Sequence, residues 1–380
     1  MASTRKGALF SAEQGRQAGI RDFIGRALGE GGFDAVLMPA RLSTGDSFTY
    51  LLINDESVLE RAFALPPIMP VQGAKAVSSI RGLARDGAAI AAFLRPCEAR
   101  AAVELSKLGQ VDLQNLTLVT LDCPGVLPLA EYLESPTKGD EIFQDGARNW
   151  NSEPMRRVCQ TCDRFSATGA EDLHIGTLGQ KDEDFLLIPQ SPKGEGLLDA
   201  LGISTEADIS GWEKEVYDLA QERKATKSQA QDELEARVQG TDNLLRLLSN
   251  CINCRNCMRV CPICYCRQCH FDSEKTRFGF EDYLARAQAQ GGLRLPADTV
   301  LFHIGRMLHM SLSCVSCGAC QDACPMDIPV AELFGLVGDA NQGAFNYVPG
   351  RSRDEPIPLA TFEQEEFEEV EQSHAGTSAT

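Results

Sequence analysis

Two runs of cysteine with the same spacing constrain this 380-residue chain more than any other feature. Both runs read C-x2-C-x2-C-x3-C-P, a spacing typical of [4Fe–4S] cluster ligation. Their members are Cys251, Cys254, Cys257 and Cys261 in the first run, and Cys314, Cys317, Cys320 and Cys324 in the second. Three thiolates must reach three irons of one small cube, and two-residue gaps let a tight loop wrap around it. The sequence therefore predicts a region that folds around two clusters.

The fourth cysteine of each run precedes a proline, and in two-cluster ferredoxins this residue binds the other cluster. We therefore expect crossed ligation, with Cys251, Cys254, Cys257 and Cys324 on one cluster, and Cys314, Cys317, Cys320 and Cys261 on the other. Zinc or disulfides are the alternatives. Zinc sites favour paired CxxC units and need no third and fourth cysteine before a proline. Because such clusters move single electrons, the spacing indicates a redox function.

The rest of the composition agrees with metal binding in a reducing compartment. The chain has 15 cysteines, and its first residues lack the apolar stretch of a signal peptide. No segment approaches the length of a membrane span, so we expect a cytoplasmic protein in which thiols serve metals. The formal charge of −18 argues against nucleic acid and anionic membranes as partners.

Apolar periodicity divides the chain into five parts. We expect an N-terminal helix within residues 1–30, centred on 11–28, and then an α/β domain with a mixed sheet over 31–204. Strands are expected at 34–38 and 116–121 and a helix at 96–108, whereas 88–94 fits either a strand or a helix. A charged helical connector (205–250), the cluster-binding region (251–348) and an acidic, partly disordered tail (349–380) complete the prediction.

The two cysteine runs lie farther apart than in a small two-cluster ferredoxin. Helical patterns at 280–289 and 298–312 fill the interval, and another follows at 328–336. This arrangement resembles the alpha-helical ferredoxins, such as the small iron–sulfur subunits of heterodisulfide reductase and anaerobic glycerol-phosphate dehydrogenase. The resemblance implies a module in which helices carry both runs.

Four further cysteines lie in the α/β region. They are Cys97, Cys123, and the CxxC pair Cys159 and Cys162. Singly, Cys97 and Cys123 read as small buried residues. Together they amount to four thiolates, for which an ordinary zinc site or a set of free thiols is one reading. Two of them end apolar strands, where sites gather in α/β folds.

These segments resemble the beta subunit family of coenzyme F420-reducing hydrogenases and F420-linked formate dehydrogenases. The resemblance rests on Leu94-Arg-Pro-Cys-Glu, Leu121-Asp-Cys-Pro-Gly, the CxxC and Asp172-Leu-His-Ile-Gly. It implies FAD, a [4Fe–4S] cluster on Cys97, Cys123, Cys159 and Cys162, and a site where F420 exchanges hydride with the flavin. The chain departs from the family pattern at Glu98, at Asp122-Cys-Pro-Gly and at Thr177, which puts the hydride donor in doubt more than the cluster.

No GxGxxG motif marks a flavin site. The stretch around Gly73 and Lys75 resembles the family segment near its flavin, where glycine allows close approach of a pyrophosphate and lysine neutralises it. An ordinary surface turn with a solvated lysine is an equal alternative.

Three cysteines, Cys264, Cys266 and Cys269, follow the first run directly. They either form an additional metal site, completed by His270 or an external ligand, or pack near the cluster as spare ligands, because three thiolates fall one short of a full set. His303 and His309 are expected beside a cluster or on the surface, and His174 in a structural role.

Together these features predict an iron–sulfur flavoprotein subunit of a soluble oxidoreductase complex. It would relay electrons between a two-electron carrier, F420 or NAD(P)H, at FAD and a catalytic partner subunit of the formate dehydrogenase, hydrogenase or heterodisulfide-reductase type. No molybdenum or nickel ligand set stands out, so the substrate site is expected on that partner. The alternative is a flavin-free electron-transfer and docking subunit.

Overall fold

The structure, a computed structural model, describes residues 6–80, 87–276 and 278–358. Within these residues the chain forms one eight-stranded sheet in the order β3-β2-β4-β5-β6-β7-β1-β8. The strands are β1 (Lys6–Ser11), β2 (Ala35–Arg41), β3 (Phe48–Ile53), β4 (Ile90–Leu94), β5 (Leu116–Leu121), β6 (Leu173–Gly176), β7 (Asp184–Pro189) and β8 (Ala207–Asp208). The four central strands β2, β4, β5 and β6 run parallel, and the flanking pairs run antiparallel. The predicted mixed sheet is therefore confirmed.

The central strands form because their side chains are buried on both faces. Every residue of β4 and β5 is buried, which fits their continuous apolar sequences. The ambiguous segment 88–94 is thus a strand rather than a helix. Helices and short 3-10 turns connect these strands: α1 (Arg16–Gly29), η1 (Glu56–Arg61), α2 (Gly73–Ser79), α4 (Pro96–Lys107), α5 (Leu129–Glu134), α6 (Pro136–Asn149), α7 (Arg157–Gln160) and α8 (Pro192–Ala200).

The N-terminal segment is part of the sheet domain. The expected helix over 11–28 corresponds to α1, whose Ile20, Phe23 and Ile24 are buried. However, β1 precedes it and pairs with β7, so the first 30 residues are more than a lone helix. Gly15, with φ +89°, lies between the strand and the helix in a conformation that favours glycine.

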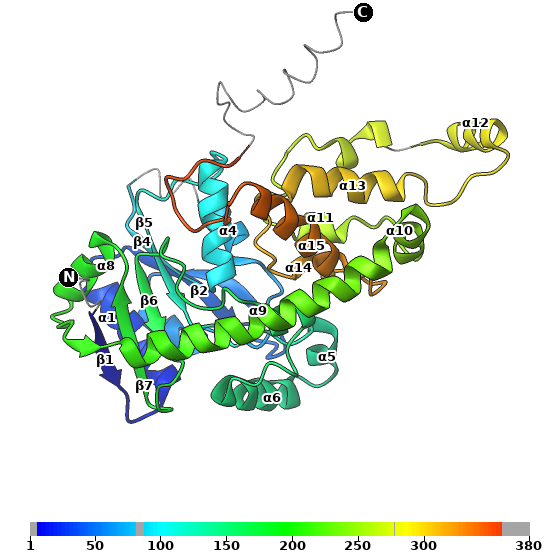
Figure 1. The fold of residues 1–380 in the computed structure, drawn as a ribbon. Helices are drawn as coiled ribbons and strands as arrows, with labels where there is room; N and C mark the ends of the chain where they lie inside the picture. Colours follow the sequence, from blue (N-terminus) through cyan, green and yellow to red (C-terminus); the bar gives the residue numbers. More distant parts are fainter. Residues whose placement is uncertain (1–5, 81–86, 277, 359–380) are drawn as a thin grey trace, which may run out of the picture.

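The connector predicted at 205–250 is mainly one long helix, α9 (Ser210–Val238), followed by α10 (Thr241–Leu247). Figure 1 shows α9 running from the sheet to the C-terminal helices. Trp212 is buried near its start, against the sheet, and Leu234 is buried near its end. The helix thus packs on both parts of the molecule.

The C-terminal part is helical, as predicted. Its elements are α11 (Asn256–Arg259), η2 (His270–Asp272), η3 (Glu274–Thr276), α12 (Phe280–Gln290), α13 (Thr299–Met310), α14 (Ala319–Asp322) and α15 (Val330–Ala344). A separate apolar core, including Met258, Phe302 and Phe334, holds them together around both cysteine runs. Residues 349–358 return to the sheet domain, where the Gly350 amide donates to Glu104. Residues 359–380, most of the expected disordered tail, lie outside the described residues.

No helix in the described part of the chain has the length and apolarity needed to cross a membrane.

Candidate iron–sulfur sites

Two of the four upstream cysteines lie at the same edge of the sheet. Strands β4 and β5 are parallel neighbours, so their carboxyl ends meet. Cys97 follows β4 in the first turn of α4, and Cys123 follows β5. Arg95, between β4 and Cys97, is buried and donates a hydrogen bond to the Cys123 sulfur at 3.0 Å. The topology therefore brings these two cysteines together, as strand-end sites in such folds require.

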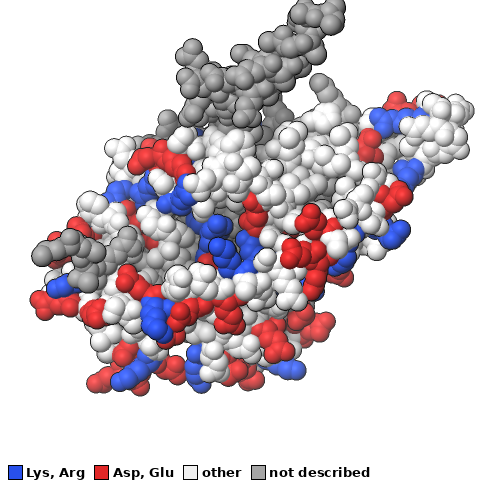
Figure 2. Space-filling view, viewed as in Figure 1, with Lys and Arg blue, Asp and Glu red and all other residues white. Residues whose placement is uncertain are grey.

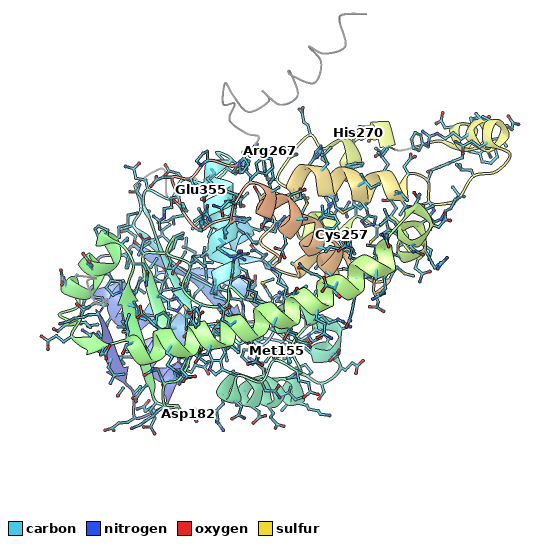
Figure 3. All side chains as sticks on the ribbon, viewed as in Figure 1. Met155, Asp182, Cys257, Arg267, His270 and Glu355 are labelled. Atoms are coloured by element: carbon cyan, nitrogen blue, oxygen red, sulfur yellow. The ribbon has the colours of Figure 1, made fainter. Side chains whose placement is uncertain are left out.

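The CxxC pair completes the group. Cys159 lies in the short helix α7, and the amide of Cys162 donates to the Cys159 carbonyl at 3.2 Å. All four cysteines line one small cavity of about 30 Å³, together with Cys317 of the second run. Met155, labelled in Figure 3, packs with Cys159 against the loop at Gly125. The structure thus brings together the four cysteines of the predicted third set.

Buried arginines surround this cavity. Arg156 is 7% exposed, and its Nε donates to the Cys159 sulfur at 3.3 Å. Arg223, from α9, is 3% exposed and reaches the Cys162 carbonyl, but its Nε and one terminal nitrogen have no partner among the described residues. Burial raises the pKa of the Cys97 and Cys162 thiols. An anionic group bound by these sulfurs would satisfy the unpaired guanidinium donors, so the residues present fit a cluster.

The first cysteine run gathers with one residue of the second. Cys257, from α11, is labelled in Figure 3. Burial raises the pKa of its thiol to about 11, Arg306 opposes the shift, and the neighbouring Cys251, Cys324 and Cys254 add to it. Cys324 is likewise an electrostatic neighbour of Cys251. The structure therefore places Cys324 beside the first run, as crossed ligation requires.

The remaining cysteines of the second run form the next group. Burial raises the pKa of Cys320, whose charged neighbours are Cys317, Arg306, Cys314 and Cys257. Cys261 is 7% exposed and belongs to the same buried core. Cys261 and Cys320 are both electrostatic neighbours of Arg306, so Cys261 lies close to this group. The two ferredoxin-type groups are adjacent.

Arg306, on α13, connects these two groups. It is 2% exposed and donates to the Cys257 sulfur and to the Cys257 carbonyl, each at 3.1 Å, while its Nε has no partner in the described structure. His303, one turn earlier, lies 3.4 Å from the Cys251 sulfur, consistent with a position beside a cluster. Sequence reasoning missed the arginines, because single arginines far apart in the chain form no spacing pattern.

The three extra cysteines line a larger cavity of about 620 Å³, which Arg306 lines as well. Cys264 lies 3.3 Å from the Met310 sulfur, and a hydrogen bond with Cys261 together with burial raises the pKa of its thiol. Cys269 lies 3.9 Å from the Met258 sulfur, and Cys266 is exposed. Over the described residues, no three His, Cys, Asp or Glu side chains are arranged to hold a single metal ion.

Gly73 and Lys75 are engaged by protein groups. The Gly73 amide donates to Glu98 at 2.8 Å, and a Cβ on Gly73 would lie 2.5 Å from the Tyr50 hydroxyl. The Lys75 ammonium donates to the Arg259 carbonyl at 2.6 Å. Packing against Tyr50 thus accounts for the glycine, and a pyrophosphate here would have to displace Glu98. These two residues do not form a flavin cradle as they stand.

His174 has the expected structural role. It is fully buried, with Nδ1 2.8 Å from the Thr120 hydroxyl and Nε2 3.0 Å from Asp122. Asp122 also accepts from the Trp212 indole at 2.8 Å, which ties α9 to the sheet.

Comparisons with known proteins define the class first. Residues 246–328 match a family model described as a 4Fe-4S dicluster domain, so the C-terminal helical part is a domain of this type. This region contains all eight cysteines of the two runs.

More particularly, the chain is similar to two beta subunits. One is the F420-dependent formate dehydrogenase subunit beta of Methanocaldococcus jannaschii, 26% identical over 72% of this chain and 77% of the relative. The other is the F420-dependent formate dehydrogenase 1 subunit beta of Methanococcus maripaludis, 28% identical over 72% and 76%. The predicted resemblance is thereby confirmed, including the oxidoreductase class to which these subunits belong.

A solved structure that the chain matches is that of the xenon-derivatized F420-reducing [NiFe] hydrogenase complex from Methanosarcina barkeri. It matches at a TM-score of 0.44 and 11% identity, over 60% of this chain and 93% of the other.

Proposed function

We propose that this chain is the electron-relaying subunit of a cytoplasmic oxidoreductase complex, with three [4Fe–4S] clusters. The ligands are Cys97, Cys123, Cys159 and Cys162 in the sheet domain, then Cys314, Cys317, Cys320 and Cys261, and finally Cys251, Cys254, Cys257 and Cys324 in the helical domain. When bound, clusters of this type accept and release single electrons. The relatives' names support the oxidoreductase class.

One observation supports the relay above all others: the three cysteine groups adjoin one another in series. Cys317 lines the same cavity as the four sheet-domain cysteines. Its neighbour in the run, Cys320, has Cys257 among its electrostatic neighbours. A chain of cysteine sulfurs thus leads from the sheet edge through the second run to the first.

The chain's own residues hold this series together. Arg156 donates to the Cys159 sulfur, to the Cys317 carbonyl and to Asp322, and so joins the sheet-domain group to the second run. Arg95 donates to the Cys123 sulfur of the sheet-domain group, and Arg306 donates to the Cys257 sulfur of the first cysteine run. Hydrogen bonds and positive charge at cluster sulfurs stabilise the reduced, more negative state.

The finer proposal concerns where electrons enter. The resemblance supports FAD in the sheet domain with F420 or NAD(P)H as the two-electron carrier, and a catalytic partner subunit of the formate dehydrogenase or hydrogenase type. The protein contacts of Gly73 and Lys75 argue against these two residues as its cradle, and the alternative is a flavin-free electron-transfer and docking subunit. Both versions share the relay.

Anaerobic purification and metal analysis test the proposal. We expect about twelve iron atoms per chain, four for each of three clusters. Iron well below about eight per chain would contradict even the two clusters of the dicluster domain. Flavin bands above the broad iron–sulfur absorbance, and flavin released on denaturation, would decide for FAD; their absence would decide for the flavin-free subunit. Reduction by F420H2, NADH, NADPH or formate, tested separately, identifies the carrier.

A further inference from the structure

A second cavity, of about 150 Å³, lies beside the sheet-domain cysteines, where α4, α7, α9 and α15 meet. Figure 2 shows Lys and Arg side chains gathered on this face, between α4 and α9. Four cationic residues line the cavity: Arg100, Arg157, Arg164 and Lys227. Only two acidic residues, Asp163 and Glu332, line it. The lining is therefore positive in a chain whose formal charge is −18.

The two acidic residues are already paired. Asp163 lies 3.7 Å from Lys227, which also pairs with Asp339 at 2.6 Å. Glu332 lies 3.5 Å from Arg157. Neither Arg100 nor Arg164 forms a salt bridge within the described residues, although Asp163 is a charged neighbour of Arg100.

Arg100 and Arg164 are neighbours with unused hydrogen-bond donors. Arg100 is 3% exposed; one terminal nitrogen donates to the Val315 carbonyl at 2.7 Å, but its Nε has no partner among the described residues. The half-buried Arg164 side chain forms no hydrogen bond or ion pair with any residue that the structure describes. Arg164 is a charged neighbour of Arg100, as are the Cys162 and Cys97 thiols, and both arginines line the cavity. Two adjacent guanidinium groups repel each other unless an anion lies between them.

We propose that this cavity is an oxyanion site, which binds a phosphate or carboxylate group between Arg100 and Arg164. Guanidinium groups match such anions with paired N–H donors. The cavity is too small for a whole nucleotide, because pockets for such ligands span roughly 300–1,000 Å³. It therefore takes a small oxyanion, or the charged end of a molecule that extends outward past α9.

The competing explanation is that these arginines only balance the charge of a cluster. Arg164 lines the cysteine cavity as well, so it serves either role. Arg100 lines the second cavity alone of the two. Its Nε has no hydrogen-bond partner among the described residues, and the titration below separates the two roles. The inference does not depend on the proposed relay, because anion binding can be measured without electron transfer.

Calorimetric titration of the iron-loaded, full-length protein with inorganic phosphate tests the site. We expect saturable binding with a dissociation constant of about 1 mM or lower. Arg164→Gln should weaken phosphate binding at least tenfold. Arg164→Lys should weaken it less, because lysine keeps the positive charge but lacks the paired N–H donors of a guanidinium group. Arg148→Gln is the control, since Arg148 is 62% exposed on α6 and pairs with Asp182 outside the cavity; it should bind phosphate as the unmodified protein does.

Two results would overturn the proposal. One is the absence of saturable binding up to about 10 mM phosphate, far above the expected constant. The other is equal phosphate affinity of Arg164→Gln and the unmodified protein at equal iron content. Titrations with formate, NADPH and F420 distinguish the source of the anion: a carrier that displaces phosphate supplies its own charged group, whereas displacement by formate alone identifies a small carboxylate.

Discussion

Replacing Arg156 tests the junction between the sheet-domain cysteines and the helical domain. Its guanidinium donates to the Cys159 sulfur at 3.3 Å, to Asp322 at 2.7 Å and to the Cys317 carbonyl. Gly318 lies so close to α7 that a Cβ would come within 2.4 Å of Val158. The two parts are therefore in direct contact at α7 and Gly318.

The stability effect follows from Asp322. The Asp322 side chain is 12% exposed and pairs with Arg156, whose side chain is 7% exposed. Removing one partner of a buried ion pair costs about 3–5 kcal/mol, because the other charge remains buried and unpaired. We expect Arg156→Leu to lose about 3 kcal/mol of unfolding free energy, and the double variant with Asp322→Leu to recover part of it.

The electrical effect follows from the distance to Cys159. A unit positive charge 3.3 Å from the sulfur contributes about 5 kcal/mol at an effective dielectric constant of about 20. If an added electron, spread over a cluster, feels a quarter of that energy, the shift is roughly 50 mV for one electron. Loss of the charge in Arg156→Gln should therefore move the reduction potential of the sheet-domain cluster to a more negative value.

Redox titration followed by electron paramagnetic resonance, with denaturant unfolding of the same samples, measures both effects. Arg157→Gln is the matched control: it is the next residue, its side chain is 67% exposed and its ion pair to Glu332 is long, at 3.5 Å. We expect the control to change neither quantity. If Arg156→Gln kept the potential and the stability of the control at equal iron content, the assigned role of Arg156 would be refuted.

Three other predictions concern separate parts of the molecule. Cys324→Ser and Cys254→Ser should each remove about four irons per chain, because each removes a ligand of the same cluster. The double variant should lose no more iron than either single variant. A loss of about eight irons by iron analysis would contradict crossed ligation. Asp122→Asn should lower the free energy of unfolding by about 3 kcal/mol, because the new NH2 group would face the N–H donors of His174, of Trp212 or of the Thr177 and Leu178 amides. Trp fluorescence during unfolding measures this loss. Burial raises the pKa of Asp122, but His174 and the hydrogen bonds that the carboxylate accepts together lower it more, so that it lies below 3.8. The contribution of ionised Asp122 to the unfolding free energy should therefore be present above about pH 4 and be lost as the pH falls further, in the unmodified protein but not in Asp122→Asn. Gly350→Ala should loosen the C-terminal return, because Gly350 has φ +73° and a Cβ would lie 2.4 Å from the Arg100 Cα; a loss of about 1–3 kcal/mol is expected, and an unchanged unfolding curve would contradict the packing described.

The cysteine groups could be predicted from the sequence because ligand spacing within a loop is a local property. In the runs that begin at Cys251 and Cys314, the complete ligand spacing lies within eleven consecutive residues. The proximity of Cys97 and Cys123 could also be predicted, because each follows an apolar strand and neighbouring parallel strands end at the same edge of a sheet.

What surrounds the cysteines could not be predicted in this way. The surrounding arginines come from four segments that are far apart in the chain and meet only in the folded structure: Arg95, Arg156, Arg223 and Arg306. Strand β1 escaped prediction for a similar reason: its six residues gain their stability from pairing with β7, about 175 residues later, and not from a strong local pattern.

The buried arginines also bear on what the cysteines bind. A buried guanidinium costs several kcal/mol unless it is paired, and two nitrogens of Arg223 and one of Arg306 have no hydrogen-bond partner in the described structure. Burial raises the pKa of the surrounding thiols, so free cysteines here would be neutral and would leave those charges uncompensated. A coordinated thiolate is deprotonated outright and stays anionic while buried. Metal binding resolves both penalties at once, because it supplies the negative charge that the arginines lack. The arginines therefore argue for metal-bound thiolates independently of the cysteine spacing.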